Sequence, residues 1–219
     1  MSNRTRVAVL ISGSGSNLQA LIDAEKAGNL PIEIVCVISN RPDVRGLERA
    51  REAGIEAVTL DHKNFASREE FDQALAAKID SYRPDLVVLA GFMRILTPEF
   101  TGHYLGRMLN IHPSLLPKYQ GLHTHQRALD AGDSEHGVTV HFVTAELDGG
   151  PAAVQAVVPV LADDDATTLA ARVQQQEHII YPLAVGWFAE GRLTMAGNQV
   201  QLDGEPLPSC GYQVRSSSA

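Results

Sequence analysis

The stretch that decides the fold is RVAVLISGSGSNLQALI, residues 6–22, near the start of the chain. Its first part, Arg6–Ile11, is a run of apolar and β-branched residues, which is typical of a strand buried on both faces. Glycine and serine then interrupt the run, and Leu18, Leu21 and Ile22 recur at helical spacing. The stretch therefore predicts a buried strand, a tight Gly-Ser loop and a helix, which together open a parallel α/β sheet.

The same alternation of strand and helix continues through the first half of the chain. Further strands are expected at Ile32–Ser39, Glu56–Leu60, Leu86–Ala90 and Met108–Ile111. The helices between them are expected from Val44 to Ala53, after the capping pair Ser67 and Glu70, and from Thr97-Pro98 to Leu105. This order predicts a parallel sheet with helices on both faces and with all carboxyl ends of its strands at one edge. Ligands of open α/β sheets bind at that edge.

The pattern changes in the second half of the chain. The expected elements are a strand, a turn, a second strand, a long helix and a small hairpin, at Val138–Val143, Asp148–Pro151, Ala152–Val160, about 167–189 and Leu193–Leu207. We predict one domain over residues 1–211, with halves of about 1–105 and 106–211, and a disordered tail over residues 212–219.

Composition limits the class of protein. The 219 residues are 44% hydrophobic and 20% charged, which is typical of a globular chain that buries a full core. A net charge of −8 disfavours nucleic-acid binding, because phosphate neutralisation needs excess lysine and arginine. Two cysteines exclude a disulfide-rich scaffold, and no apolar run reaches the ~18 residues that span a bilayer. Since the polar N-terminus does not resemble a signal peptide, we expect a cytoplasmic protein without a membrane partner.

The Gly-Ser loop, residues 12–17, is the first candidate site. Such a loop before a helix offers backbone N–H groups and the positive end of the helix dipole, both of which suit phosphate. The dinucleotide fingerprint is incomplete, because Leu18 occupies its third glycine position. The next strand also ends in Ser39-Asn40-Arg41, without a ribose-binding acid, so a nicotinamide cofactor is weakly supported. A tight turn without a ligand is the alternative, and the loop alone leaves both open.

The second candidate site is Asn110-Ile111-His112, at the end of the last parallel strand. A histidine there can act as acid or base at neutral pH. Asn110, two residues earlier, projects to the same side of a strand and can donate a hydrogen bond to an oxyanion. Taken alone, a single histidine is more often structural than catalytic, and Asp148 before two glycines is most simply a turn residue.

Histidines elsewhere raise the question of a metal site. His123 and His125 are spaced for two ligands on one strand face, and His141 lies on the following strand. The sequence contains no H-x-x-E-H or C-x-x-C pattern to support such a site. We therefore predict no catalytic metal.

Five longer motifs together resemble one family. They are SGSGSNLQAL (12–21), VLAGFMRIL (88–96), LNIHPSLLPKYQGLHTH (109–125), GVTVHFVTAELDGGP (137–151) and QQQEHIIYP (174–182). In this order they are similar to the phosphoribosylglycinamide formyltransferases, folate-dependent enzymes of purine synthesis, from Arg6 to about Gly211. The resemblance implies the α/β formyltransferase fold, a Rossmann-like, mostly parallel twisted sheet with flanking helices and an antiparallel C-terminal extension.

The resemblance also implies a reaction in de novo purine (IMP) biosynthesis. The formyl group of the co-substrate 10-formyltetrahydrofolate would be transferred to the amine of N1-(5-phospho-D-ribosyl)glycinamide, here called glycinamide ribonucleotide. No metal takes part in this reaction. The expected partners are these two small molecules alone, and the expected oligomeric state is a monomer or a homodimer.

By the same resemblance, three sets of residues have roles in this reaction. The catalytic set is Asn110, His112 and Asp148. The ribonucleotide and phosphate contacts are Gly15, Ser16, Asn17, Gln174, Gln175, Gln176 and Glu177. The folate contacts are Arg68, Met93, Arg94, Ile95, Leu96, Asn110, Thr144, Ala145, Glu146, Leu147 and Asp148. From composition alone, Arg68, Arg94 and Glu177 would be interpreted as solvated surface residues.

Three alternatives stay open at this stage. Methionyl-tRNA formyltransferases share the Asn-x-His…Asp core but need a further nucleic-acid-binding domain. Formyltetrahydrofolate hydrolases share it too, but usually carry an additional regulatory domain at the N-terminus. A Rossmann-like binding module without catalysis is the third alternative, and the presence of Asn110, His112 and Asp148 argues against it.

Overall fold

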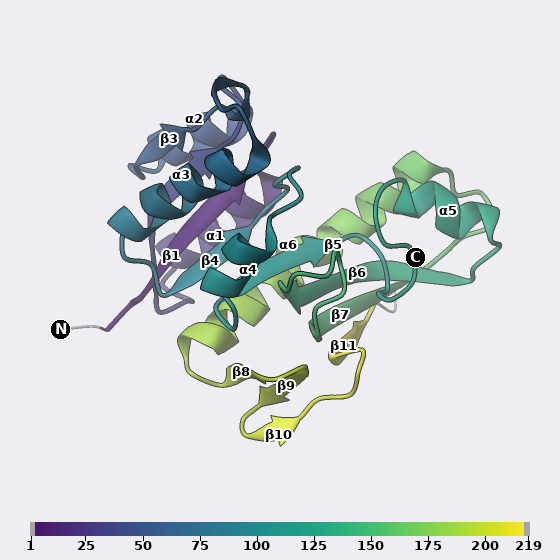
Figure 1. Cartoon of the computed structure of the whole chain (residues 1–219). Coiled ribbons are helices and arrows are strands. Elements are labelled where there is room, and N and C mark those ends of the chain that lie inside the picture. The colour runs from purple at the N-terminus through teal and green to yellow at the C-terminus, as the bar shows by residue number, and fades with distance from the viewer. Residues whose placement is uncertain (1–2, 217–219) are drawn as a thin grey trace. The chain divides into compact units, whose positions relative to one another are not determined.

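A computed structural model describes residues 3–216 of the chain (Figure 1). The chain divides into two compact units, residues 1–110 and 111–219. The boundary lies close to the expected one between residues 105 and 106. Whether both halves form a single folding domain stays a prediction.

The first unit contains the expected parallel sheet. Its strands are β1 (Thr5–Ile11), β2 (Ile32–Ser39), β3 (Ala57–Thr59), β4 (Leu86–Leu89) and β5 (Met108–His112), the last of which continues into the second unit. They follow the order β3-β2-β1-β4-β5, and all neighbours are parallel. The order reverses between β1 and β4, so the loops that leave these two strands meet at a topological switch point, where ligands of such sheets bind.

Helices and caps follow the local sequence signals. The helices of this unit are α1 (Ser16–Lys26), α2 (Arg45–Glu52), the 3-10 turn η1 (His62–Asn64), α3 (Arg68–Ser81) and α4 (Pro98–His103). The Ser67 side chain accepts from Glu70 N–H at the start of α3, and Thr97 accepts from Phe100 N–H at the start of α4. Both predicted N-termini are confirmed. Residues Val7–Ile11 are fully buried, as their uninterrupted apolar run predicts.

The second unit is built on antiparallel pairing. Its elements are α5 (Thr124–Asp130), β6 (Glu135–Phe142), β7 (Ala152–Pro159), α6 (Ala166–Ala189), β8 (Leu193–Ala196), β9 (Gln199–Leu202), β10 (Glu205–Pro206) and β11 (Tyr212–Arg215). β6 and β7 are antiparallel, α6 packs on both, and β8, β9 and β10 form a separate small antiparallel sheet. The predicted fold class is confirmed. Among residues 3–216, no helix combines the length and the apolar character that a bilayer crossing requires.

The predicted tail over residues 212–219 is wrong for its first part. Tyr212–Arg215 form strand β11, which pairs in parallel with β7 from Tyr212↔Val154 onward. The chain can lie this close because Gly211 has no Cβ, which would stand 2.7 Å from the backbone of Ala153. The Tyr212 ring also meets the edge of Trp187, with centroids 5.2 Å apart. Ser216 N–H still donates to the Val157 carbonyl oxygen at 2.9 Å, and residues 217–219 of the predicted tail lie outside the described residues.

Candidate active site

His112 ends strand β5 and is nearly buried, with 9% of its side chain exposed. Its Nε2 atom lies 2.8 Å from the backbone carbonyl oxygen of Tyr119. A carbonyl oxygen can only accept a hydrogen bond, so Nε2 must carry a proton. The other ring nitrogen, Nδ1, is therefore the one that can exchange a proton.

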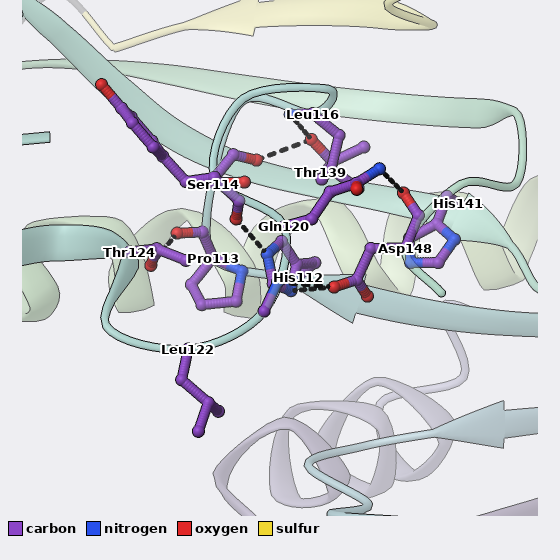
Figure 2. A network of polar contacts seen from close by, with 12 residues as sticks. His112, Pro113, Ser114, Leu116, Gln120, Leu122, Thr124, Thr139, His141 and Asp148 are labelled. Atoms are coloured by element: carbon purple, nitrogen blue, oxygen red, sulfur yellow. Dashed lines mark hydrogen bonds and ion pairs between the residues drawn. The ribbon is translucent and has the colours of Figure 1, made fainter. Parts of the chain in front are cut away.

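Asp148 faces this second nitrogen. Its Oδ2 atom lies 3.7 Å from His112 Nδ1, and only 8% of its side chain is exposed. Figure 2 shows the two side chains facing each other. The distance is too long for a hydrogen bond but short enough for an ion pair when the imidazole is protonated. The same oxygen accepts a 2.9 Å hydrogen bond from Gly121 N–H, which holds the carboxylate in place. The structure thus brings together two of the three predicted catalytic residues.

The loop of residues 117–123 provides a hydrogen-bond partner for each member of the His112–Asp148 pair. Tyr119 adopts a left-handed backbone conformation with φ of 54°, which few residues other than glycine adopt. Its hydroxyl donates to Asp133, and the Arg127 guanidinium lies over its ring at 5.2 Å. Arg127 also donates to the carbonyl oxygen of Gln120 at 2.6 Å. These contacts fix the backbone that supplies the Tyr119 carbonyl group and Gly121 N–H.

Gln120 belongs to this loop and stands where the resembling family often has proline. Its side-chain amide donates to the Asp148 carbonyl oxygen at 3.4 Å. The departure from the family pattern therefore adds a contact between the loop and the Asp148 turn.

Asn110 lies two residues before His112 on β5, opposite Leu89 of β4 in register. Alternate side chains of a strand project to the same face, so the amide of Asn110 and the imidazole share one side of β5.

A cavity of about 390 Å³ in the second unit reaches Asp148. Its lining combines Leu116 and Pro117 with the segments 148–152, 198–200 and 207–210. The C-terminal segments were not among the predicted site residues, because the sequence gives no sign that they approach the Asp148 turn.

The Gly-Ser loop packs tightly against the first turn of α2. Gly15 caps α1 with φ of 73°, and a Cβ there would stand 2.8 Å from Gly46 Cα. Gly46 N–H donates to the carbonyl oxygen of Gly13 at 3.0 Å, and Arg49 Nε donates to that of Ser14 at 2.7 Å. The carbonyl groups of Gly13 and Ser14 are thus hydrogen-bonded to α2. The N-terminus of α1 lies just after the carboxyl end of β1, and a helix N-terminus in this position suits an anion.

The segment after β4 carries the predicted folate residues 93–96. Its Met93 and Ile95 side chains are 59% and 57% exposed, so two large apolar groups close in sequence are open to solvent, as contact with a flat apolar ligand would need. Arg68 of α3 contacts the Ile95 carbonyl oxygen at 3.5 Å, so these two predicted folate residues do lie together. The Arg94 guanidinium lies over the Phe71 ring at 5.0 Å.

The other predicted contacts lie on separate elements. Gly15, Ser16 and Asn17 open α1 in the first unit, whereas Gln174, Gln175, Gln176 and Glu177 belong to α6 in the second. Residues 144–147 form the bend between β6 and the Asp148 turn. The binding roles of these residues stay predictions.

The expected strand placement of His123 and His125 is wrong, whereas His141 does lie on a strand, β6. His123 has φ of 58° and caps α5, and His125 lies inside that helix, so the two do not share a strand face. His125 Nδ1 instead contacts His136 Nε2 of β6 at 3.1 Å. Within residues 3–216, no three histidine, cysteine, aspartate or glutamate side chains gather in an arrangement that could hold a metal ion.

His136 predicts a pH dependence of stability. Burial lowers the pKa of this imidazole from 6.5 to about 4. Between these values the unfolded chain binds a proton that the folded chain does not. The free energy of unfolding is therefore highest above about pH 6.5 and falls toward pH 4, by about 3 kcal/mol from this group.

Chemical denaturation at several pH values checks this prediction. His136→Gln should make this slope clearly smaller but not abolish it, because burial also lowers the pKa of His125 and of His141. His103→Gln, at an exposed surface histidine, should leave the slope unchanged. An unchanged slope in His136→Gln would show that another group is responsible.

Comparison with known proteins finds a matching family and similar proteins over most of the chain. The formyl transferase family model matches residues 5–185. The phosphoribosylglycinamide formyltransferase of Escherichia coli (strain K12) is 60% identical over 206 residues, which are 94% of this chain and 97% of the relative. The human trifunctional purine biosynthetic protein adenosine-3 is 46% identical over 195 residues, 89% of this chain but 19% of that protein.

Solved structures agree with these relatives. The structure of the phosphoribosylglycinamide formyltransferase from Coxiella burnetii, in complex with CHES, superposes with a TM-score of 0.93 at 54% identity. The match covers 96% of this chain and 99% of that one.

Proposed function

This chain belongs to the formyl transferase family, and we propose that it transfers the formyl group of 10-formyltetrahydrofolate to the amine of glycinamide ribonucleotide. The reaction is a step of de novo purine biosynthesis. The observation that carries this proposal is the buried His112–Asp148 pair, in a chain that matches phosphoribosylglycinamide formyltransferases over nearly their whole length.

The chemistry begins when the amine nitrogen attacks the formyl carbon and one electron pair moves to the carbonyl oxygen. The resulting tetrahedral intermediate carries a negative oxygen. The Asn110 amide and the protonated His112 ring supply the donors that stabilise it. When the bond between this carbon and the folate nitrogen breaks, the oxygen regains its double bond and the products are the formylated ribonucleotide and tetrahydrofolate.

Two protons must move for the reaction to balance. The attacking amine loses one, and the departing folate nitrogen gains one. Because Nε2 of His112 is engaged by the Tyr119 carbonyl group, we assign delivery of the second proton to Nδ1. Asp148, 3.7 Å from Nδ1, would offset the positive charge of the ring when it is protonated and take part in removing the first proton. No step of this scheme calls for a metal ion.

The proposal assigns the ribonucleotide to the N-terminus of α1 and to the polar side chains of α6. Gly15, Ser16 and Asn17 would bind the phosphate through helix-terminal N–H groups. Glu177, with Gln174, Gln175 and Gln176, would bind ribose hydroxyl groups and the glycinamide.

Folate is assigned to the exposed apolar segment after β4 and to the bend before Asp148. Its proposed contacts are Arg68, Met93, Arg94, Ile95, Leu96, Asn110, Thr144, Ala145, Glu146, Leu147 and Asp148. Main-chain groups of Met93–Leu96 would read the flat pterin, and a guanidinium would bind the folate carboxylates. The exposure of Met93 and Ile95 and the contact of Arg68 with Ile95 support this assignment.

A cytoplasmic location belongs to the same proposal. Both cysteines, Cys36 and Cys210, are free thiols, which suits a reducing compartment.

The test of the proposal is whether formyl loss depends on the acceptor. We expect the purified protein to form tetrahydrofolate from 10-formyltetrahydrofolate only when glycinamide ribonucleotide is present. Formate release in its absence would instead identify a hydrolase, and absence of turnover with both substrates would identify a binding module.

A further inference from the structure

Two buried polar side chains of the first unit have no part in the proposed chemistry. Ser12, directly after β1, is 4% exposed, and Asn40, directly after β2, is 1% exposed. Burial of a hydroxyl or an amide is costly unless its polar atoms are paired. The hydrogen-bond partners of Ser12 and Asn40 therefore indicate the role of these two side chains.

Ser12 binds the segment that leaves β4 at two places. Its Oγ accepts a 2.8 Å hydrogen bond from Met93 N–H, and its own N–H donates to the Gly91 carbonyl oxygen at 3.1 Å. The hydroxyl in turn donates to Asn40 Oδ1. The chain of donors thus runs in one direction, from Met93 N–H through Ser12 Oγ–H to Asn40 Oδ1.

Asn40 is itself held at its other end. The Nδ1 atom of His62 lies 3.3 Å from the amide nitrogen of Asn40 and 3.2 Å from its backbone carbonyl oxygen. The hydrogen bonds from Met93 N–H through Ser12 to Asn40, here called the relay, therefore end beside the His62 ring. Its Nδ1 atom either accepts from the Asn40 amide or donates to the Asn40 carbonyl oxygen, depending on the tautomer.

Ser12 connects the two segments of the first unit to which the proposed function assigns substrates. Ser12 is the residue before Gly13 at the start of the Gly-Ser loop. Its hydroxyl is hydrogen-bonded to the backbone of the segment that carries the exposed side chains of Met93 and Ile95. β1 and β4, which lead into these two segments, are neighbours in the sheet. One hydroxyl therefore ties the proposed phosphate loop to the proposed folate segment.

We propose that Ser12 and Asn40 are positioning residues that hold the Gly91–Met93 backbone in the shape that receives folate, and that couple it to the ribonucleotide loop. The inference rests on the proposed function, because that function assigns a substrate to each segment. Ser12 is not itself expected to touch either substrate.

The first test compares Ser12→Ala with Ser12→Thr. Alanine can neither accept from Met93 N–H nor donate to Asn40, whereas threonine can do both. We expect Ser12→Ala to raise the KM for 10-formyltetrahydrofolate about 10-fold, the scale of one buried hydrogen bond. The KM for glycinamide ribonucleotide should change less than about 3-fold, and Ser12→Thr should restore most of the loss.

A double-mutant cycle tests the relay. If Asn40 acts through Ser12, then Asn40→Ala raises the folate KM as well, and adding it to Ser12→Ala has little further effect. Fully additive effects, equal changes in both KM values, or a lower melting temperature with unchanged KM would contradict the positioning role.

A measurement on the unmodified protein covers the case in which these variants fail to fold. Binding of glycinamide ribonucleotide should slow hydrogen exchange of the Met93 amide, because the relay ties this amide to the loop that binds the phosphate. Unchanged exchange at saturating ribonucleotide would overturn the coupling. Failure of the proposed function would show differently, as an absence of ribonucleotide-dependent turnover in the unmodified protein.

Discussion

Replacing His112 with alanine is expected to lower kcat by about 10²–10⁴-fold, the range that general acid–base groups contribute. The imidazole is the only titratable ring on the carboxyl end of β5, and its Nδ1 atom faces a carboxylate at 3.7 Å. In the proposed mechanism, alanine removes the proton donor for the departing folate nitrogen and the cation that stabilises the oxyanion. The KM values should change much less than kcat, because binding is assigned to other residues.

The surface pair His103 and Asp80 provides a matched control. These side chains are closer, at 2.7 Å, but both are about half exposed, so solvent weakens their interaction. His103→Ala should therefore leave kcat within about 2-fold of the unmodified enzyme. Melting temperatures of both variants separate loss of chemistry from loss of fold. A His112→Ala protein that folds and turns over at a near-normal rate would refute the assigned role.

Replacing Asp148 with asparagine is the change with the second largest expected effect. The asparagine side-chain oxygen can still accept from Gly121 N–H, so the turn keeps its shape. The negative charge 3.7 Å from His112 Nδ1 is lost, so the positive charge of the protonated ring no longer has its partner. We expect kcat to fall about 10²–10³-fold.

The same surface pair serves as the control for this change. Asp80→Asn removes a carboxylate from a histidine in the same way but at an exposed site, and should leave kcat unchanged. If Asp148→Asn were as active as Asp80→Asn, the carboxylate would be a turn residue only, which is the simplest interpretation of its sequence.

Local sequence signals predicted most of the fold. The apolar run of β1, the caps at Ser67 and Thr97, and the turn between β6 and β7 all depend on neighbours in sequence. The elements that were missed have other causes. β11 forms because Tyr212–Arg215 lie beside the distant strand β7, and α5 begins just after His123, whose left-handed backbone the residue pattern does not reveal.

In the candidate site, too, some features could be predicted from neighbouring residues and others depend on distant contacts. The end of β5 could be located from the sequence, so His112 and Asn110 could be predicted to share one strand face. The contact of His112 with Tyr119 could not, because it requires a positive φ at a tyrosine, which the side-chain pattern does not reveal. The approach of residues 198–200 and 207–210 to the Asp148 turn depends on tertiary packing in the same way.

The most direct test of the account follows the formyl carbon itself. The unmodified protein is incubated with glycinamide ribonucleotide and 10-formyltetrahydrofolate that carries ¹³C in the formyl group, and the product carbons are resolved by NMR. We predict that the label appears in the amide of the formylated ribonucleotide, in equal amount to the tetrahydrofolate formed, with negligible labelled formate. Recovery of the label as formate, at a rate independent of the ribonucleotide, would contradict the account.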